Sequence, residues 1–248
     1  MKIIEWNCRY GDFQGKKTAI LEHKPDILVV PECENIVSLT FHNGTQPSAM
    51  EWVGDSVNRY GIGVFGFNGY CFEKLGSCDH VKYFGAFRAF RGETSLTLLV
   101  AWANKTGSSE KYHEIVEEAI KHYDQLLQKD KVLFIGDFNT PGTGNNLDNP
   151  KIDKPNSYLK KHLEIVETLK NKGLESVYHC KNEEEHGHET TATLFYCGCQ
   201  EGRFHCDYCF ASKDMREALT GSEPVKIGEF DVWKKDSDHM PLIVDFNL

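Results

Sequence analysis

Residues 132–140 read VLFIGDFNT, and the rest of the chain can be interpreted outward from this stretch. Its first four residues are apolar β-formers, bounded by charged residues before them and by Gly136 after them, which favours a short buried strand. Asp137 and Asn139 follow at the strand end, and Pro141 with Gly142 then forces a loop. Either the aspartate caps a turn, or it forms part of a ligand site, since ligands of open α/β sheets bind at this edge.

The composition is that of a globular protein. The chain has 248 residues, of which 40% are hydrophobic and 26% charged. No linker, repeat or low-complexity tract interrupts it, so we expect a single domain over residues 1–248. The formal net charge of −9 disfavours loose, charge-driven binding to nucleic acid, although a local basic groove is compatible with it.

The sequence also bears on location. The apolar runs have the length of strands, and none reaches the length of a membrane span. The first residues, MKIIEWNCRY, lack the apolar segment of a signal peptide. Nine scattered cysteines fit reduced thiols better than a disulfide framework. We therefore expect a cytoplasmic protein that does not bind a membrane and is a monomer by default.

Strand-like and helix-like patterns follow one another along the chain. We expect strands at residues 2–7, 26–30, 61–67, 70–74, 81–90, 95–102, 132–135, 174–180, 193–197, 203–211, 225–227, 230–233 and 241–246. We expect helices at residues 14–23, at 108–128 with Ser108 or Ser109 as N-cap, and at 158–170 with Gly173 in the C-cap position. Residues 35–58 and 143–156 are expected to be loops, and the charged residues 181–189 a mobile segment.

The order of these elements predicts the architecture. Closely spaced strands without intervening helices indicate antiparallel meanders, and each half of the chain contains a strand–helix–strand unit. This combination predicts an α/β (α+β) fold, in which two mixed β-sheets pack face to face as a sandwich and helices flank the outer faces.

Polar or aromatic side chains recur where the expected strands end. They are Asn7, Glu32, Trp102, Asn104, Asp137, Asn139, Asp207, Asp238 and His239. Hydrolysis of a phosphodiester develops negative charge on oxygen, which Mg²⁺ held by carboxylate and amide oxygens can stabilise. The reaction also needs a base for water, such as a carboxylate, and a donor aimed at phosphate, such as a histidine held by a carboxylate. The set supplies all of these groups.

Five short motifs stand in a characteristic order. They are W-N at residues 6–7, P-E at 31–32, G-D-F-N at 136–139, D-Y-x-F at 207–210 and S-D-H-x-P-L at 237–242. In this order the chain resembles the endonuclease/exonuclease/phosphatase superfamily, which has the deoxyribonuclease-I-like fold. The resemblance covers residues 3–246.

The resemblance implies a metal site. Glu32 matches the main metal ligand of the family, with Asn7 and Asp238 beside it. The expected cofactor is Mg²⁺, with Mn²⁺ as a substitute.

The resemblance also implies catalytic roles. Asp137 matches the group that holds and deprotonates the attacking water, and Asn139 the group that positions this water or the phosphate. His239 matches the partner of the scissile phosphate oxygen, and Asp207 the carboxylate that orients this histidine.

Trp102 departs from the family pattern, because many members have a histidine there and some apurinic-site endonucleases a tyrosine. Indole does not titrate, so an acid role at this position is in doubt. Trp102 and Asn104 are expected to contact substrate, with Trp102 as a stacking ring or pocket wall, and core filling is the alternative for Trp102.

Histidines and cysteines crowd into residues 179–209, and a structural zinc site is one interpretation. Cys206 and Cys209 argue against it, because residues three apart on a strand face opposite sides. Three further histidines, His113, His122 and His162, fall on expected helices and are interpreted as solvated.

The resulting hypothesis is an Mg²⁺-dependent phosphoric ester hydrolase that cleaves phosphodiester bonds of nucleic acid by direct water attack, with DNA and RNA both open. The alternative is the same chemistry on a small phosphorylated metabolite, nucleotide or lipid headgroup, which the charge of −9 favours slightly. A degenerate binding module without turnover is a third hypothesis, supported only by Trp102.

Overall fold

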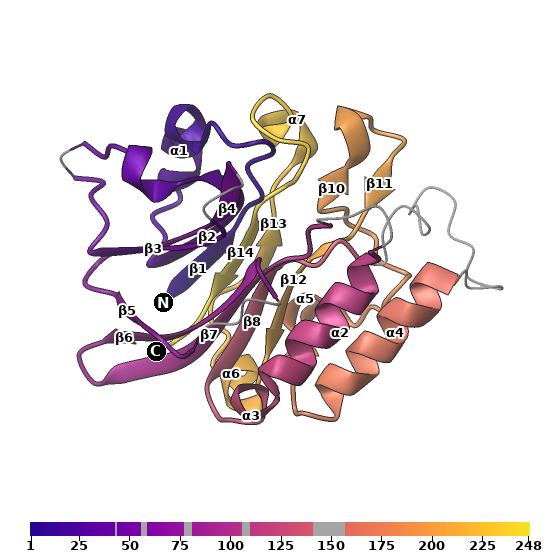
Figure 1. Ribbon diagram of the computed structural model, residues 1–248. Helices are drawn as coiled ribbons and strands as arrows, with labels where there is room; N and C mark the ends of the chain where they lie inside the picture. The colour runs from indigo at the N-terminus through magenta and orange to yellow at the C-terminus, as the bar shows by residue number, and fades with distance from the viewer. Residues whose placement is uncertain (43, 56–58, 77–80, 106–109, 141–156) are drawn as a thin grey trace.

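A computed structural model describes the chain except for residues 43, 56–58, 77–80, 106–109 and 141–156, and two six-stranded sheets packed face to face form its centre (Figure 1). Sheet 1 has the order β13 (Val225–Ile227), β14 (Leu242–Asp245), β1 (Lys2–Glu5), β2 (Ile27–Glu34), β4 (Tyr60–Gly66) and β3 (Ala49–Val53). Sheet 2 has the order β5 (Cys71–Lys74), β6 (Phe84–Arg91), β7 (Thr94–Trp102), β8 (Val132–Asp137), β12 (Asp207–Ala211) and β9 (Glu175–Ser176). A hairpin of β10 (Leu194–Phe195) and β11 (Arg203–Phe204) stands apart from both sheets.

Both sheets are mixed, as the sequence predicts. The pairs β1–β2 and β7–β8 are parallel, and the other strand pairs of the two sheets are antiparallel. Alternate residues of a strand point to opposite faces, so each central strand contributes to two cores. Ile3, Leu133 and Ile135 lie in the core between the sheets, whereas Ile4 and Phe134 lie in the outer cores.

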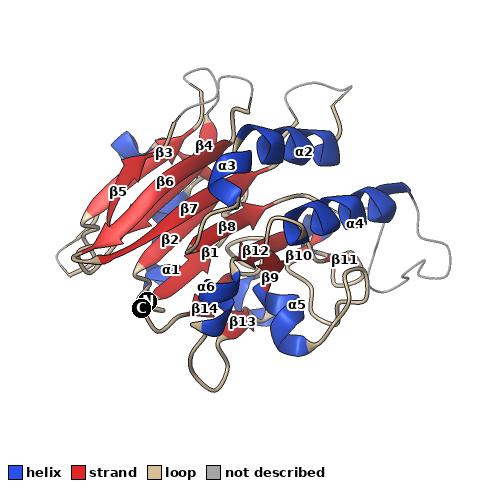
Figure 2. Cartoon of the chain, turned by 90° about the horizontal axis from the view of Figure 1, so that it is seen from below, coloured by secondary structure: helices blue, strands red, loops and turns tan. Residues whose placement is uncertain are grey.

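Helices cover the outer faces. α1 (Phe13–Leu21) packs Phe13 and Ile20 against sheet 1. α2 (Tyr112–His122) and α4 (Ser157–Lys170) lie side by side outside sheet 2, in the outer core that contains Val116 and Ile165 (Figures 1 and 2). The shorter helices are α3 (Asp124–Leu127), α5 (Val177–Asn182), α6 (Lys213–Glu217) and α7 (Phe230–Trp233). The predicted sandwich with flanking helices is therefore confirmed.

The expected long helix at 108–128 is shorter. α2 begins at Tyr112 with Lys111 in the N-cap position, and α3 follows it after Tyr123. The proposed caps Ser108 and Ser109, and the loop at 143–156, lie outside the described residues. The C-cap at Gly173 is confirmed, since its φ is 85° and its N–H donates to Lys170 O.

Three expectations for irregular or extended segments are wrong. The loop expected at 35–58 contains the edge strand β3, whose residues are all half-buried and so show no alternation. The strand expected at 174–180 is only the two-residue β9 followed by α5, whose first three residues are all buried. The strand expected at 230–233 is the helix α7, because a helical turn places Phe230 on Phe195 and Trp233 on Trp6 together.

None of the described helices is long and apolar enough to cross a membrane.

We predict that Gly136→Ala destabilises the protein strongly. Gly136 has a φ of 151°, and a Cβ built there would lie 1.9 Å from the backbone oxygen of Ala101 on the neighbouring strand. Because backbone cannot yield as a side chain can, we expect a loss of about 3 kcal/mol in the free energy of unfolding, measured by urea titration. Gly92→Ala is the control, since that residue also has positive φ but open space around it, and about 1 kcal/mol is expected. Equal losses for the two variants would contradict the steric argument.

Candidate active site

Asp137 ends β8 with a fully buried side chain on the face that meets sheet 1. The chain turns back immediately after it, because Asn139 adopts a positive φ of 50°. The backbone N–H of Asn139 donates to Asp137 Oδ1 at 2.8 Å, and its side-chain Nδ2 donates to Oδ2 at 2.9 Å. The turn that follows the apolar strand thus holds both oxygens of the carboxyl group.

Asn7 connects Asp137 to Glu32. Its Nδ2 donates to Asp137 Oδ2 at 3.0 Å and to Glu32 Oε1 at 3.1 Å. Glu32 has a positive φ of 59° where the β2–β4 register shifts, a β-bulge that takes its side chain out of the alternation of the strand. Its Oε2 accepts the backbone N–H of Tyr10 at 2.6 Å. The ends of β1, β2 and β8 therefore converge on one amide.

Asp207 faces Asp137 across the antiparallel pair of β12 and β8. Both of its oxygens accept from His239 Nδ1, at 3.0 and 3.1 Å. The backbone around His239 is also fixed, since its carbonyl accepts from Trp6 Nε1 at 3.0 Å and its N–H donates to Ser237 Oγ at 3.0 Å. The histidine is buried and has one ring nitrogen committed to the carboxylate, as the sequence predicts for an oriented imidazole.

The structure thus brings together six of the predicted residues in one hydrogen-bonded and cross-strand-paired group, which we call the carboxylate cluster. Its members are Asn7, Glu32, Asp137, Asn139, Asp207 and His239.

Asp238 joins this group through Arg9, which the sequence analysis did not single out. The Nε of Arg9 lies 3.4 Å from Asp238 Oδ2, and its backbone N–H donates to Asn7 Oδ1 at 2.9 Å. A cation bound by Asp238 would compete with this arginine.

Trp102 and Asn104 lie beside the cluster. Trp102 stands next to Asp137 in the parallel register of β7 and β8, but its ring is only 6% exposed and packs against Tyr83 at 4.8 Å. Asn104 is half-buried, and the adjacent Ala103 carbonyl accepts from Asn139 Nδ2 at 3.1 Å. The burial of Trp102 is typical of a core residue. Contact of Trp102 or Asn104 with substrate stays a prediction.

Glu5 is a functional candidate that the sequence analysis missed. It lies on the inner face of β1 with Ile3, fully buried, and neither carboxyl oxygen has a hydrogen-bond partner within the described residues. The available signal was the spacing of Ile3, Glu5 and Asn7, which puts all three on one face of a strand.

Burial and the closeness of these charged groups shift their pKa values. Burial, and then the Asp207 carboxylate, raises the pKa of Asp137 to about 7 despite the opposing effect of His239. Burial raises the pKa of Glu5 well above its usual range, and Asp207 and Asp137 raise it further. Burial acts to lower the pKa of His239, but the charge and hydrogen bonds of Asp207, with Asp137 and Asp238, raise it well above the usual imidazole value. Asp137 and Glu5 are therefore driven to bind protons or cations, and His239 is held protonated.

The residues fit a hard divalent cation. Glu32, Asp137, Asp238 and Asn7 offer carboxylate and amide oxygens, the ligands that Mg²⁺ prefers. The unpartnered, buried carboxyl group of Glu5 adds another acidic group beside Asp137 and Asp207. Ligand atoms of Asp137, Asp207 and His239 also lie within 4.8 Å of one another, but the ring nitrogen facing Asp207 is already hydrogen-bonded to it.

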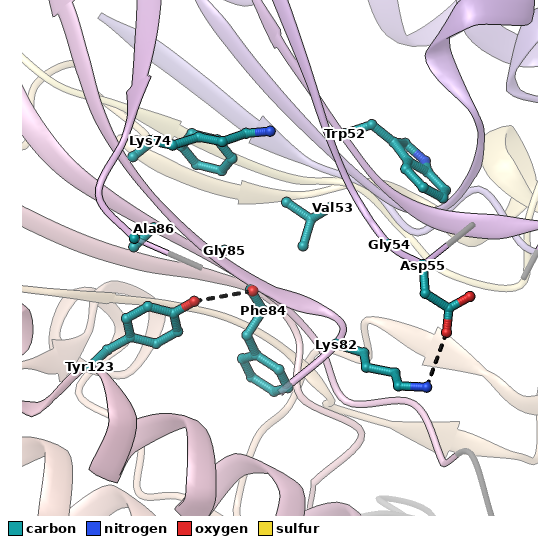
Figure 3. Close-up of a pocket in the computed structure, with 12 residues that line it drawn as sticks. Trp52, Val53, Gly54, Asp55, Lys74, Lys82, Phe84, Gly85, Ala86 and Tyr123 are labelled. Atoms are coloured by element: carbon teal, nitrogen blue, oxygen red, sulfur yellow. Dashed lines mark hydrogen bonds and ion pairs between the residues drawn. The ribbon is translucent and has the colours of Figure 1, made fainter. Parts of the chain in front are cut away.

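A separate pocket of about 340 Å³ opens beside β3, β5 and β6 (Figure 3). Its lining includes Trp52 and Val53, and a Lys82–Asp55 ion pair of 3.2 Å lies at one side. None of the predicted site residues lines it. The predicted site residues therefore do not surround this pocket.

Solved structures share this architecture. The chain is similar to a 3′ phosphatase from Neisseria, NExo, bound to a product DNA hairpin (TM-score 0.70, 17% identity), and to an AP endonuclease from Archaeoglobus fulgidus (TM-score 0.68, 16% identity), with 100% of both chains covered in each case. It is also similar to the endonuclease domain of TRAS1, a telomere-specific non-LTR retrotransposon (TM-score 0.65, 14% identity), over 100% of this chain and 98% of that one.

These likenesses fix the fold. The chain has the deoxyribonuclease-I-like fold, which confirms at the level of the fold the resemblance drawn from the five motifs. No protein-family model matches the chain, and the comparison with curated proteins gives no match.

We predict that Asp207→Asn lowers the pKa of His239. The protonated ring of His239 stabilises the native protein at low pH. This contribution is lost as the pH rises through the pKa of His239 in the folded state, which lies well above 6.5. Without the carboxylate, burial acts on the ring largely unopposed, so His239 should become neutral near pH 7. The measurement is an NMR titration of the histidine Cε1–H signals, assigned with His239→Gln. An unchanged His239 titration in Asp207→Asn would contradict the assigned cause.

Proposed function

We propose that the protein is a divalent-metal-dependent hydrolase that cleaves phosphodiester bonds of nucleic acid by direct attack of water. The single observation that supports this most strongly is the meeting of the strand ends of both sheets in the carboxylate cluster, where Asn7 joins Glu32 to Asp137 and Asp207 holds His239. The fold shared with two nucleases and a 3′ phosphatase agrees with it.

Each residue of the cluster would have a role that follows from its chemistry. Glu32, Asn7 and Asp238 would hold Mg²⁺, which when bound neutralises charge on the phosphate and the leaving oxygen. Asp137, whose pKa is raised to about 7, would accept the proton of the attacking water while Asn139 fixes the orientation of its carboxylate. His239, kept protonated by Asp207, would donate a hydrogen bond to a phosphate oxygen on which negative charge develops.

The first test is Asp137→Asn, which keeps the shape of the side chain and removes its basicity. We expect metal-dependent cleavage of labelled oligonucleotides to fall by about 1,000-fold, while circular dichroism shows a folded protein. Chelation of divalent cations should abolish the native activity, and addition of Mg²⁺ should restore it.

Asp231→Asn is the matched control, because that aspartate is exposed on α7 and pairs only with Lys234 among the described residues, so its activity should equal that of the native protein. Full activity of Asp137→Asn would refute the proposed role of this residue. A native protein that turns over no phosphoester with any metal would instead support the degenerate binding module.

A small phosphorylated substrate is the second candidate. The net charge of −9 supports it, since a long polyanion is repelled by an acidic protein unless a local basic surface receives it. The chemistry of the cluster would be the same for both substrates.

Salt dependence distinguishes the two. If several phosphates are contacted, KM for a single-stranded oligonucleotide should rise about tenfold between ~50 and ~200 mM salt, because counterions are released on binding. A panel of DNA, RNA and small phosphoesters, each assayed at both salt concentrations, measures this. Fast, salt-insensitive turnover confined to a small phosphoester would exclude nucleic acid as the substrate.

A further inference from the structure

A second group of titratable side chains lies on the other face of sheet 2, and the proposed hydrolysis does not use it. Four histidines and one glutamate gather there from α4, α5, the segment after α5 and the residue two before β12. We call them the histidine cluster: His162, His179, His186, Glu189 and His205. They pack over the ring of Tyr208, whose centroid lies 5.1 Å from those of both His162 and His205.

The structure corrects two expectations here. His162, interpreted from the sequence as solvated, is 1% exposed, and Glu189, in the segment expected to be mobile, is 5% exposed. Cys197 and Cys199 are exposed, and no group of potential metal ligands among the described residues includes a cysteine. A zinc site built on the cysteines is therefore not what the fold assembles.

His179 and Glu189 form the centre of the cluster. His179 Nε2 lies 3.1 Å from Glu189 Oε1, and His179 Nδ1 lies 2.8 Å from Ser176 Oγ. Two ligands of a tetrahedral Zn²⁺, each about 2.0–2.2 Å from the ion, are about 3.3–3.5 Å apart, so these two atoms already have nearly the required separation. A metal-binding histidine is usually oriented by donating its other ring N–H to a second group, and Ser176 Oγ is placed to accept from Nδ1 here.

Two buried atoms of the cluster have no hydrogen-bond partner within the described residues: Glu189 Oε2 and His205 Nε2. His205 is 1% exposed, and its Nδ1 is bonded to the carbonyl of Thr191 at 2.8 Å, which leaves the lone pair on Nε2. A buried carboxylate oxygen and a buried imidazole lone pair each cost free energy unless a donor or a cation meets them. Both atoms can only accept, so a donor or a cation is the partner that each of them lacks.

His186 brings a third imidazole. Its ring stacks on that of His179 with centroids 3.5 Å apart and an angle of 13° between the planes, and its Nδ1 lies 3.0 Å from His162 Nε2. Ligand atoms of His179, His186 and Glu189 lie within 4.8 Å of one another. A metal lies in the plane of each ring that binds it, so His186, which is only half-buried, must tilt out of the stack to bind.

We propose that the histidine cluster is a second metal site, distinct from the carboxylate cluster, which binds Zn²⁺ through His179, His186 and Glu189, with His205 as the next available ligand. Three imidazoles and one carboxylate form a ligand set that suits Zn²⁺ and disfavours Mg²⁺. On binding, the ring proton of His179 moves from Nε2 to Nδ1, where it is donated to Ser176 Oγ, and the ion takes the place of that proton between Nε2 and Glu189.

Hydrogen bonding and access agree with this assignment. Glu189 Oε1 accepts the Gly187 N–H at 3.0 Å and also faces His179 Nε2, which fixes the carboxyl group beside the imidazole. A cavity of about 250 Å³ lined by His179, His186 and Ser176 gives an ion a way in.

The test is zinc content, which is independent of catalysis. The native protein, stripped with chelator and then dialysed against Zn²⁺ followed by metal-free buffer, should retain one zinc per chain by mass spectrometry of the metal. Replacement by Co²⁺ should give the visible absorption of a tetrahedral site. Chelation should lower the melting temperature.

Variants locate the ion. Glu189→Gln and His186→Ala should each weaken zinc binding by more than about tenfold, and His186→Ala removes a half-buried ring, so its fold should survive. His188→Ala is the matched control, an exposed histidine in the same segment, and Asp137→Asn in the carboxylate cluster should also keep its zinc. A native protein that retains no zinc overturns the proposal. Full retention by folded His186→Ala and Glu189→Gln, or loss confined to Asp137→Asn, overturns it equally.

Discussion

The register of β12 on β8 is the constraint on which the site depends, because it sets Asp207 directly opposite Asp137. Side chains in this relation are about 5 Å apart, and like charges there repel each other. Burial strengthens the repulsion, since both carboxyl groups are fully buried. The surrounding groups compensate it on each side: Asn7 and Asn139 donate to Asp137, and His239 carries the opposite charge at Asp207.

Sheet 1, which faces β8 and β12, adds a third acidic group beside Asp137 and Asp207. Glu5 reaches the interior from β1, and its pKa is raised by burial and then by both aspartates. Three carboxyl groups from two sheets therefore share one end of the inner core, and the packing of the sandwich is itself part of the site. Glu32 differs from them, since the bulge in β2 turns it toward Asn7 and the backbone of Tyr10. The geometry separates a buried proton-binding group from the outer residues that would hold a metal.

The sequence predicted the residues of the carboxylate cluster because each one stands in a short motif after, before or within an expected strand, as Asp137 follows residues 132–135. It did not predict Glu5, since a charged residue in a four-residue strand looks the same whether it faces solvent or the interior. The histidine cluster was anticipated only as a crowding of histidines and cysteines in residues 179–209, and two of its members, His162 and Glu189, were missed for another reason. The buried residues of α4 are Leu159, His162, Ile165 and Leu169, so the spacing placed His162 on the apolar face, but histidine was interpreted as solvated. Glu189 follows a charged segment with no periodic pattern, and only tertiary contacts bury it.

β12 connects the two clusters through its two faces. Asp207, Cys209 and Ala211 point into the inner core, whereas Tyr208 and Phe210 point outward beneath the imidazoles, Phe210 being stacked at 6.1 Å from His186. A slip of one residue in this strand would exchange the two faces and bring a phenol to the place of the Asp207 carboxylate. The strand start is held at two points, because Thr193 Oγ1 accepts the N–H groups of both Cys206 and Asp207, and His205 is bonded to the carbonyl of Thr191. An ion that binds His205 or its neighbours would add a third point. A metal ion bound in the histidine cluster would then stabilise the register in which Asp207 holds His239.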